Sequence, residues 1–390
     1  MPSTPPMPTA AADRSPFATT RWTPAQVAAI RSDSRATIPR VQAAELAPGV
    51  PGLDLWDLWP LQHADGSTVR FDGWTPWFVL SAPRLSDPEA RHAVARIRLM
   101  TERDGLWRDH GNLLPDALNP GSREWAGSCR YDPASHAITL FWTAAGDRGE
   151  RESSFRQRMF EVTGTLAVTP DGLAATSWGT PREIAGGEIA HYQQVTATTG
   201  VPGFIKGFRD PAHFRDPADG AEYLLFTGSL REARSSWNGC IGMLRRAGDG
   251  WDVLPPLLSA DGLNNEQERP HMVMHQGRYY LFWSTQRKVF APDGPSGPNG
   301  LYGMVAERLA GPWHPLNGGG LVAGNPEDAP FQTYSWWVTD ELTVHGFIDY
   351  PHGNEGNACP DIAWRRANFG GVPAAVFRLR LDGERAEIAP

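Results

Sequence analysis

The sequence predicts an all-β fold of the β-propeller type, and three observations support this prediction. Short apolar runs bounded by Gly, Pro, Asp or Asn recur after about residue 50, as is typical of strands joined by turns. Helical periodicity over ten or more residues is nearly absent beyond residue 33. Glycine and proline are abundant, with 41 and 35 residues, which implies many short elements.

The N-terminal segment differs from the rest of the chain. Residues 1–20 are rich in Pro, Ala, Ser and Thr, and we expect them to form a flexible or wrapping tail. Residues 23–33 are the best helix candidate, because Thr23 can cap the helix and Pro24 suits its first turn. A length of 390 residues fits one large domain or two. We expect a single propeller domain over residues 21–390, beginning with a short helical segment.

Strand-like runs, rich in aromatic and β-branched residues, follow at intervals. We predict strands at residues 76–81, 137–142, 223–227, 278–283, 303–306 and 344–348.

A repeated cadence links these runs at residues 121–144, 208–229 and 265–286. In each unit a charged or Trp-containing motif is followed by a strand, a polar hairpin and an apolar-aromatic strand. Blades of a propeller have this appearance, and a propeller gathers such motifs around one central funnel. A β-sandwich is the competing all-β interpretation, but it would not naturally end the first strand of each unit in a polar motif.

Composition and charge exclude several classes of function. The net charge is −8 and no basic run is present, which argues against a nucleic-acid partner and, more weakly, against anionic membranes. No stretch approaches the roughly 20 apolar residues of a membrane span. The N-terminus has no apolar region of the signal-peptide kind, so we expect a cytoplasmic protein or export by another route. The three cysteines, Cys129, Cys240 and Cys359, fit no zinc motif and are expected to be structural or free thiols.

Tryptophan is frequent, with 16 residues. Flat aromatic faces stack well on the C–H faces of sugar rings, although any single tryptophan can equally belong to the core.

Three acidic motifs are candidates for chemistry: LDLWDLWP at residues 53–60, FRDP at 208–211 and EQERP at 266–270. Taken alone, each acid is more often a turn residue or a solvated ion pair. Glycoside cleavage, however, needs one ionised carboxylate and one carboxyl group that holds a proton. Asp57, on a stiff and apolar stretch, suits the first task. Glu268, crowded by Glu266 and Arg269, suits the second.

The motifs resemble those of glycoside hydrolase family 68, which contains levansucrases, inulosucrases and bacterial β-fructofuranosidases. The resemblance covers most of the chain from about Trp22. It is carried, in order, by WDLWPL at 56–61, EWAG at 124–127, FRDP at 208–211, ERP at 268–270, GPNGLYG at 297–303, LNGGGLVAGNP at 316–326 and FQTYS at 331–335. The last three segments are similar to the Gram-negative branch.

The resemblance implies a five-bladed propeller with a deep central pocket and a retaining reaction on sucrose. Asp57 would attack the fructosyl unit, Glu268 would act as general acid and then base, and Asp210 would stabilise the transition state. A second FRDP follows at 214–217, and we assign Asp216 to a hairpin turn because Asp-Pro followed by Asp-Gly is turn chemistry. The sugar-binding residues implied or expected are Trp56, Trp125, Arg209, Glu266, Arg269, Gln286 and Tyr334. Sucrose and fructosyl acceptors would be the partners, and no cofactor is expected.

Several positions depart from the family pattern. Ala126 stands where many members carry Ser, a change that decides little by itself. Asn265 stands where Asp is common, and we therefore expect no structural metal. Thr227 replaces a Glu, Gln286 replaces a His or Arg, and Trp336 replaces a His. We interpret these last three changes as a reshaped acceptor rim around an intact fructosyl pocket.

A changed acceptor rim favours hydrolysis or transfer to short acceptors. Water needs no binding subsite to act as acceptor, whereas a growing fructan chain must be held by one. Three alternatives remain: a levan-forming levansucrase, a fructosyltransferase acting on a different β-fructoside or acceptor, and a catalytically inactive sugar-binding propeller.

Overall fold

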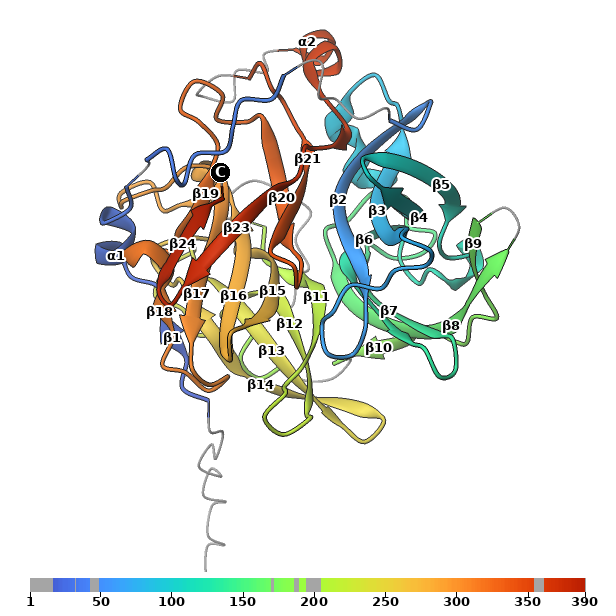
Figure 1. Ribbon diagram of the computed structural model, residues 1–390, viewed down its shortest axis with the longest axis horizontal. Helices are drawn as coiled ribbons and strands as arrows, with labels where there is room; N and C mark the ends of the chain where they lie inside the picture. Colours follow the sequence, from blue (N-terminus) through green and yellow to red (C-terminus); the bar gives the residue numbers. More distant parts are fainter. Residues whose placement is uncertain are drawn as a thin grey trace, which may run out of the picture.

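The computed structural model describes residues 17–31, 33–42, 49–169, 172–185, 189–193, 205–353 and 361–389. Antiparallel sheets stand around a central axis as the blades of a five-bladed β-propeller (Figure 1), which confirms the predicted fold class. Hydrogen bonds join the first two blades into one continuous sheet, because β2 and β6 pair in parallel at Leu61 and Cys129.

The blades follow one another along the chain. Blade I holds β2 (Leu53–Gln62), β3 (Thr75–Pro83), β4 (Arg96–Arg103) and β5 (Leu106–Asn112). Blade II holds β6 (Arg123–Asp132), β7 (Ala137–Ala145), β8 (Gln157–Thr169), β9 (Gly172–Thr176) and β10 (Arg182–Ile184). Blade III holds β11 (Phe208–Arg215), β12 (Glu222–Ser229), β13 (Gly239–Ala247) and β14 (Gly250–Ser259). Blade IV holds β15 (Glu268–His275), β16 (Arg278–Thr285), β17 (Gly300–Ala306), β18 (His314–Pro315) and β19 (Leu321–Gly324). Blade V holds β20 (Thr333–Val338), β21 (Thr343–Ile348), β22 (Val372–Pro373), β23 (Phe377–Asp382) and β24 (Arg385–Ile388). All six predicted strands lie within or overlap strands of the structure.

The N-terminal segment forms a strap around the outside of the ring before it enters β2 (Figure 1). Strand β1 (Thr20–Arg21) pairs in parallel with β14 of blade III. Thr37 then pairs with Gly324 of blade IV, and the Val41 N–H donates to the side chain of Gln332, next to β20 of blade V. Residues 1–16 of the predicted tail lie outside the described residues, so a flexible tail stays a prediction there. Residues 17–20 contact the ring, because Phe17 packs against Tyr223 and Thr20 pairs with Leu258.

The predicted helix is present but shorter than expected. Helix α1 spans Pro24–Ala28, and Thr23 caps it through a reciprocal pair of hydrogen bonds with Gln26. Val27 is the buried residue of this helix. A longer helix would gain little, because most helical stability in proteins comes from packing of an apolar face. A second helix, α2 (Ile362–Asn368), precedes the last strands of blade V.

The innermost strand of every blade carries a β-bulge at its functional motif. The pairing register shifts between Trp56 and Leu58, Trp125 and Gly127, Arg209 and Ala212, Glu268 and His271, and Tyr334 and Trp337. In the last three blades a non-glycine residue at the bulge has a positive φ: Asp210 (62°), Arg269 (52°) and Ser335 (62°). Bulges re-aim side chains and are frequent next to active sites. We infer that the five bulges direct side chains of the five motifs toward the central axis of the propeller.

Hydroxyl groups join each of three bulges to the preceding blade. Thr143 of β7 accepts the Asp210 N–H at 2.9 Å, Thr227 of β12 accepts the Arg269 N–H at 3.1 Å, and Ser284 of β16 accepts the Trp336 N–H at 3.0 Å. The three residues occupy equivalent positions, because they pair with Trp125, Arg209 and Glu268, each directly before its bulge. These bonds satisfy backbone N–H groups that the bulges remove from the ladder.

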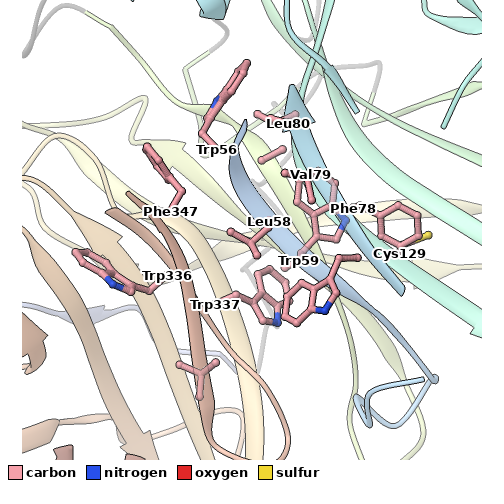
Figure 2. Packing of buried hydrophobic residues seen from close by; sticks show 14 of the residues in the cluster. Trp56, Leu58, Trp59, Phe78, Val79, Leu80, Cys129, Trp336, Trp337 and Phe347 are labelled. Atoms are coloured by element: carbon pink, nitrogen blue, oxygen red, sulfur yellow. The ribbon is translucent and has the colours of Figure 1, made fainter. Parts of the chain in front are cut away.

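Most tryptophans with fully buried side chains belong to the core between blades. Figure 2 shows Trp56, Leu58 and Trp59 along β2, with Trp336 and Trp337 of β20 nearby. Trp59, Trp77, Trp142, Trp283 and Trp336 are at most 1% exposed and lie outside the group of residues that lines the cavity described below. For these positions core packing, and not sugar stacking, is the correct interpretation.

Candidate functional site

A cavity of about 440 Å³ opens at the centre of the ring where the five bulges meet. It is lined by all ten residues predicted to be catalytic or sugar-binding: Trp56, Asp57, Trp125, Arg209, Asp210, Glu266, Glu268, Arg269, Gln286 and Tyr334. Residues from all five blades or the loops that follow them line this one space. The spatial convergence predicted from the motifs is therefore present, while the chemical role of each residue stays a prediction.

Asp57 lies at the bulge of β2, directly after Trp56, which lines the cavity. Trp59, two residues further along the strand, is buried in the core. Burial raises the pKa of its carboxyl group, and the charge of Glu268 adds to this effect. Arg269 and a hydrogen bond with Ser335 act in the opposite direction and favour the ionised form. Arg269 is itself fixed, because its guanidinium donates to the Ser335 carbonyl at 2.8 Å and the Ser335 hydroxyl at 2.6 Å.

Asp210 is held from several directions. Its left-handed backbone directs the carboxylate to Thr227, whose hydroxyl donates to Oδ2 at 2.8 Å. The Arg269 N–H donates to the same oxygen at 3.3 Å. Burial raises the Asp210 pKa to about 6, against the opposing charge of Arg209. The carboxyl group is therefore rigid and titrates near neutrality.

Arg209 connects three acids of the cavity. Its Nη2 lies 2.9 Å from Glu268 Oε1 and 3.4 Å from Glu266 Oε2, and its Nε lies 3.6 Å from Asp210 Oδ2. Its Nη1 is buried and has no partner among the described residues. A buried N–H group without an acceptor costs folding free energy, so Nη1 is suited to donate a hydrogen bond to a substrate oxygen.

Glu268 has a second partner opposite Arg209. The Tyr334 hydroxyl donates to Glu268 Oε2, and burial raises the Tyr334 pKa far above its usual value. Two donors thus fix both oxygens of Glu268 before any substrate binds.

Glu266 is the more deeply buried neighbour. Burial raises its pKa to about 7, although Arg209 opposes this shift, and Asn265 Nδ2 lies 3.3 Å from Oε1. Glu266 therefore gains or loses a proton close to neutral pH.

The structure corrects the interpretation of a reshaped acceptor rim. Of the three substituted positions, Gln286 lines the cavity, but Thr227 and Trp336 are not among the described residues that do so. Thr227 is fully buried behind Asp210, and Trp336 is 1% exposed in the core. Both belong to the joints between blades. Ala126 lines the cavity beside Trp125, whereas Asp216 lies in the hairpin after β11, as predicted, and accepts the Tyr279 hydroxyl at 2.6 Å.

One wall of the cavity was missed by sequence reasoning. It consists of Glu89, Arg91 and His92 from the 3-10 helix η2 (Pro88–Ala93), which follows β3, and of Asp349 and Tyr350, which follow β21. The Tyr350 hydroxyl donates to Glu89 Oε1 at 2.7 Å, which joins blades V and I. A signal existed for Asp349, because it directly follows the predicted strand at 344–348.

No candidate metal centre was found in the described part of the chain, where no three His, Cys, Asp or Glu side chains are clustered suitably. Asn265 instead contacts the ammonium of Lys206 and the Ile205 carbonyl. Cys129 and Cys240 are buried free thiols, and Cys359 lies outside the described residues. Among the helices of the described residues, none has the length and apolar character of a bilayer span.

Comparison with known proteins identifies the family. The Levansucrase/Invertase model of glycoside hydrolase family 68 matches residues 12–240 and 231–388. The chain belongs to this family. The levansucrase of Rahnella aquatilis is 30% identical over 95% of the chain and 94% of its own length. The levansucrase of Zymomonas mobilis is 30% identical over 94% of the chain and 89% of its own length.

Solved structures agree with the family 68 assignment. The inulosucrase from Halalkalicoccus jeotgali bound to kestose superposes with a TM-score of 0.86 at 35% identity, covering 95% of both chains. The levansucrase from Gluconacetobacter diazotrophicus superposes with a TM-score of 0.80 at 23% identity, over 97% of this chain and 91% of the other, and this similarity concerns the fold.

Proposed function

We propose that this family 68 chain is an enzyme that cleaves sucrose and transfers the fructosyl group to water or a short acceptor. The observation that supports this best is the convergence of Asp57, Asp210 and Glu268, from blades I, III and IV, on one cavity. The levansucrase relatives and the kestose-bound inulosucrase add support for a fructosyl substrate.

The proposed reaction has two displacements. Asp57 attacks the anomeric carbon of the fructosyl unit, so that a carboxylate–carbon bond forms as the glycosidic bond breaks. Glu268 gives its proton to the departing glucose oxygen. In the second step Glu268 takes a proton from the acceptor hydroxyl, which attacks the same carbon and releases Asp57. The configuration at the anomeric carbon is retained.

Asp210 and Arg209 have supporting roles in this proposal. Positive charge grows on the sugar ring in the transition state, and ionised Asp210 stabilises it at close range. Arg209 holds Glu268 and Glu266 in position, and its Nη1 is available for a sugar oxygen. Trp56 and Trp125 supply apolar walls for the fructosyl ring.

The acceptor is water or a short saccharide in this proposal, and a levan-forming activity is the alternative. Gln286 is the substituted position that still supports a changed acceptor site, since it lines the cavity. Product analysis on concentrated sucrose separates the two. Free fructose and short oligosaccharides are expected, whereas abundant high-molecular-weight levan would contradict the proposal.

Glucose release from sucrose tests the reaction itself. Asp57→Asn should reduce the rate by at least about 10⁴-fold, because it removes the nucleophile and leaves the shape of the site. Asp216→Asn is the control, because it makes the same chemical change at a buried aspartate that lies in the hairpin after β11 and is not among the described residues that line the cavity. Retention of full activity by Asp57→Asn would show that another group attacks the sugar.

A further inference from the structure

Asp349 is a cavity carboxylate that the proposed reaction does not use. It lies directly after β21, lines the cavity, and has an Oδ1 atom that is buried without a partner among the described residues. Its backbone is fixed on both sides, because its N–H donates to the Gln332 carbonyl at 3.0 Å and its carbonyl accepts the Gly370 N–H at 2.8 Å. A rigid and unsatisfied buried oxygen in a sugar-sized cavity calls for a hydrogen-bond donor from the ligand.

The blade repeat places Asp349 at the position of Gln286. In blade IV, Ser284 pairs with Glu268 and Gln286 follows two residues later. In blade V, Phe347 pairs with Tyr334 and Asp349 follows two residues later. Both side chains line the cavity, so the second strands of blades IV and V present them from equivalent places.

Arg91 faces the same part of the cavity. It is 5% exposed, lies 5.5 Å from the centre of the Trp56 ring, and has a buried Nε without a partner among the described residues. Its Nη1 donates to the Pro88 carbonyl at 2.9 Å and to Glu89 Oε1 at 3.0 Å. No ion pair within 4.0 Å joins it to Asp349, although both residues are described. Arg91 and Asp349 thus carry opposite charges without a direct contact. A ligand group that donates a hydrogen bond to the carboxylate and accepts one from the guanidinium can bind between them.

Several charged groups that line the cavity act on the carboxyl group of Asp349. Burial raises its pKa to about 7, Arg91 and Lys288 oppose this, and Glu89 and Asp57 add to it. Asp57 in turn senses the charge of Arg91. The Arg91 guanidinium lies 5.5 Å from the ring of Trp56, which directly precedes Asp57 and is the proposed wall for the fructosyl ring. We therefore expect Arg91 and Asp349 to border the fructosyl unit.

We propose that Asp349 is a substrate-binding residue that accepts a hydrogen bond from one hydroxyl of the fructosyl unit, while Arg91 donates to the oxygen of that hydroxyl. A sugar hydroxyl satisfies both partners, because it has one donor hydrogen and two acceptor lone pairs. This inference rests on the proposed function and adds a residue that selects the sugar.

The test combines variants of Asp349 with substrates that lack one hydroxyl. The kcat/KM for glucose release is measured with sucrose and with a set of sucrose analogues, each missing a single hydroxyl of the fructosyl ring. Asp349→Ala is expected to lose about 10- to 100-fold with sucrose, as for a hydrogen bond to a charged group. With the analogue that lacks the hydroxyl bound by Asp349, the kcat/KM of the wild type should already be reduced by a similar factor. Asp349→Ala should then reduce the kcat/KM for this analogue by less than about threefold more.

Controls separate binding from structure. Asp349→Asn keeps the shape and an acceptor oxygen, so it should show the same dependence on the analogue with a smaller loss. Asp216→Asn, on blade III, should leave the ranking of the analogues unchanged. An equal loss for sucrose and every analogue would overturn the inference, because Asp349 would then act only through the structure. Absence of glucose release by the wild type would instead overturn the proposed function.

Discussion

At the scale of single residues, the site is governed by burial. Asp57, Asp210 and Glu266 all have raised pKa values, and burial is the largest cause in each case. Neighbouring donors such as Thr227 and Arg209 then decide how far each pKa rises. That these acids line one cavity could be predicted from the motifs. Their protonation could not, because it depends on partners from other strands and blades, such as Thr227 beside Asp210 and Arg209 beside Glu266.

The acid limb of the pH profile is the first prediction at this scale. Asp210 must be ionised to stabilise positive charge, and burial raises its pKa to about 6. We expect kcat/KM for sucrose to fall as the pH decreases through about 6, with an apparent pKa that belongs to the coupled carboxyl groups together. A pH–rate profile from pH 4 to 8 measures it, and a constant rate down to pH 4.5 would contradict the assignment.

A variant of Thr227, the hydrogen-bond donor to Asp210, tests whether Asp210 sets the acid limb. Thr227→Val removes the hydroxyl that donates to Asp210 Oδ2. Loss of a hydrogen bond to the charged form should move the acid limb upward by roughly one pH unit. Thr227→Ser keeps the hydroxyl and should leave the limb in place. An unmoved limb in Thr227→Val would mean that Asp210 does not set it.

At the scale of elements, the blade is a repeat that structure shows more clearly than sequence. The innermost strand of each blade has a bulge at its motif. In blades II, III and IV, a hydroxyl on the second strand accepts a hydrogen bond from a backbone N–H on the innermost strand of the following blade. The six strands were predictable because their apolar runs are bounded by turn residues. The bulges were not, because they arise from pairing between strands, and the substitution at Thr227 was therefore mistaken for a change at the rim.

The joint at Thr143 gives a prediction for this scale. Thr143→Val leaves the Asp210 N–H buried without an acceptor, which should lower the free energy of unfolding by about 1–3 kcal/mol and reduce kcat. Thr139→Val, on the same strand, is the control. Among the described residues, the hydroxyl of Thr139 bonds only to the hydroxyl of Thr163, at 3.1 Å. Denaturant unfolding and sucrose assays compare the two. Equal effects on kcat would show that the joint does not position Asp210.

At the scale of the whole molecule, blades I and V meet without shared strands. Side chains hold this seam together with a backbone hydrogen bond, which the Leu55 N–H donates to the Gly371 carbonyl at 2.9 Å. Asp54 of β2 pairs with Arg366 of α2 at 2.6 Å, and Asp87 pairs with Arg365 at 2.7 Å. The N-terminal strap reinforces the ring by contacting blades III, IV and V before it enters blade I. A propeller and its short helix were predictable from local patterns, whereas the course of the strap was not, since its partners are about 200 to 300 residues away in sequence.

Trp22 anchors the strap and allows a test of it. Its ring packs at 5.3 Å from those of Trp283 and Tyr302, and its Nε1 donates to the Gly319 carbonyl at 3.0 Å. Trp22→Ala should lower the free energy of unfolding by about 3–5 kcal/mol, as for other buried aromatic truncations. Leu106→Ala, at a position that is 61% exposed, should have little effect. Similar midpoints for the two variants would show that the strap adds nothing to stability.

The strap also dictates an order of assembly. It leaves the ribosome before the blades on which it docks, because its partners lie between residues 258 and 332, about 200 to 300 residues later in the sequence. Until those later blades exist, Trp22 and Val27 have no core to enter and stay exposed to water. The strap therefore cannot dock while blades III, IV and V are still being synthesised. The sugar-binding cavity, which is lined by residues of all five blades, can form only once the last blade is complete.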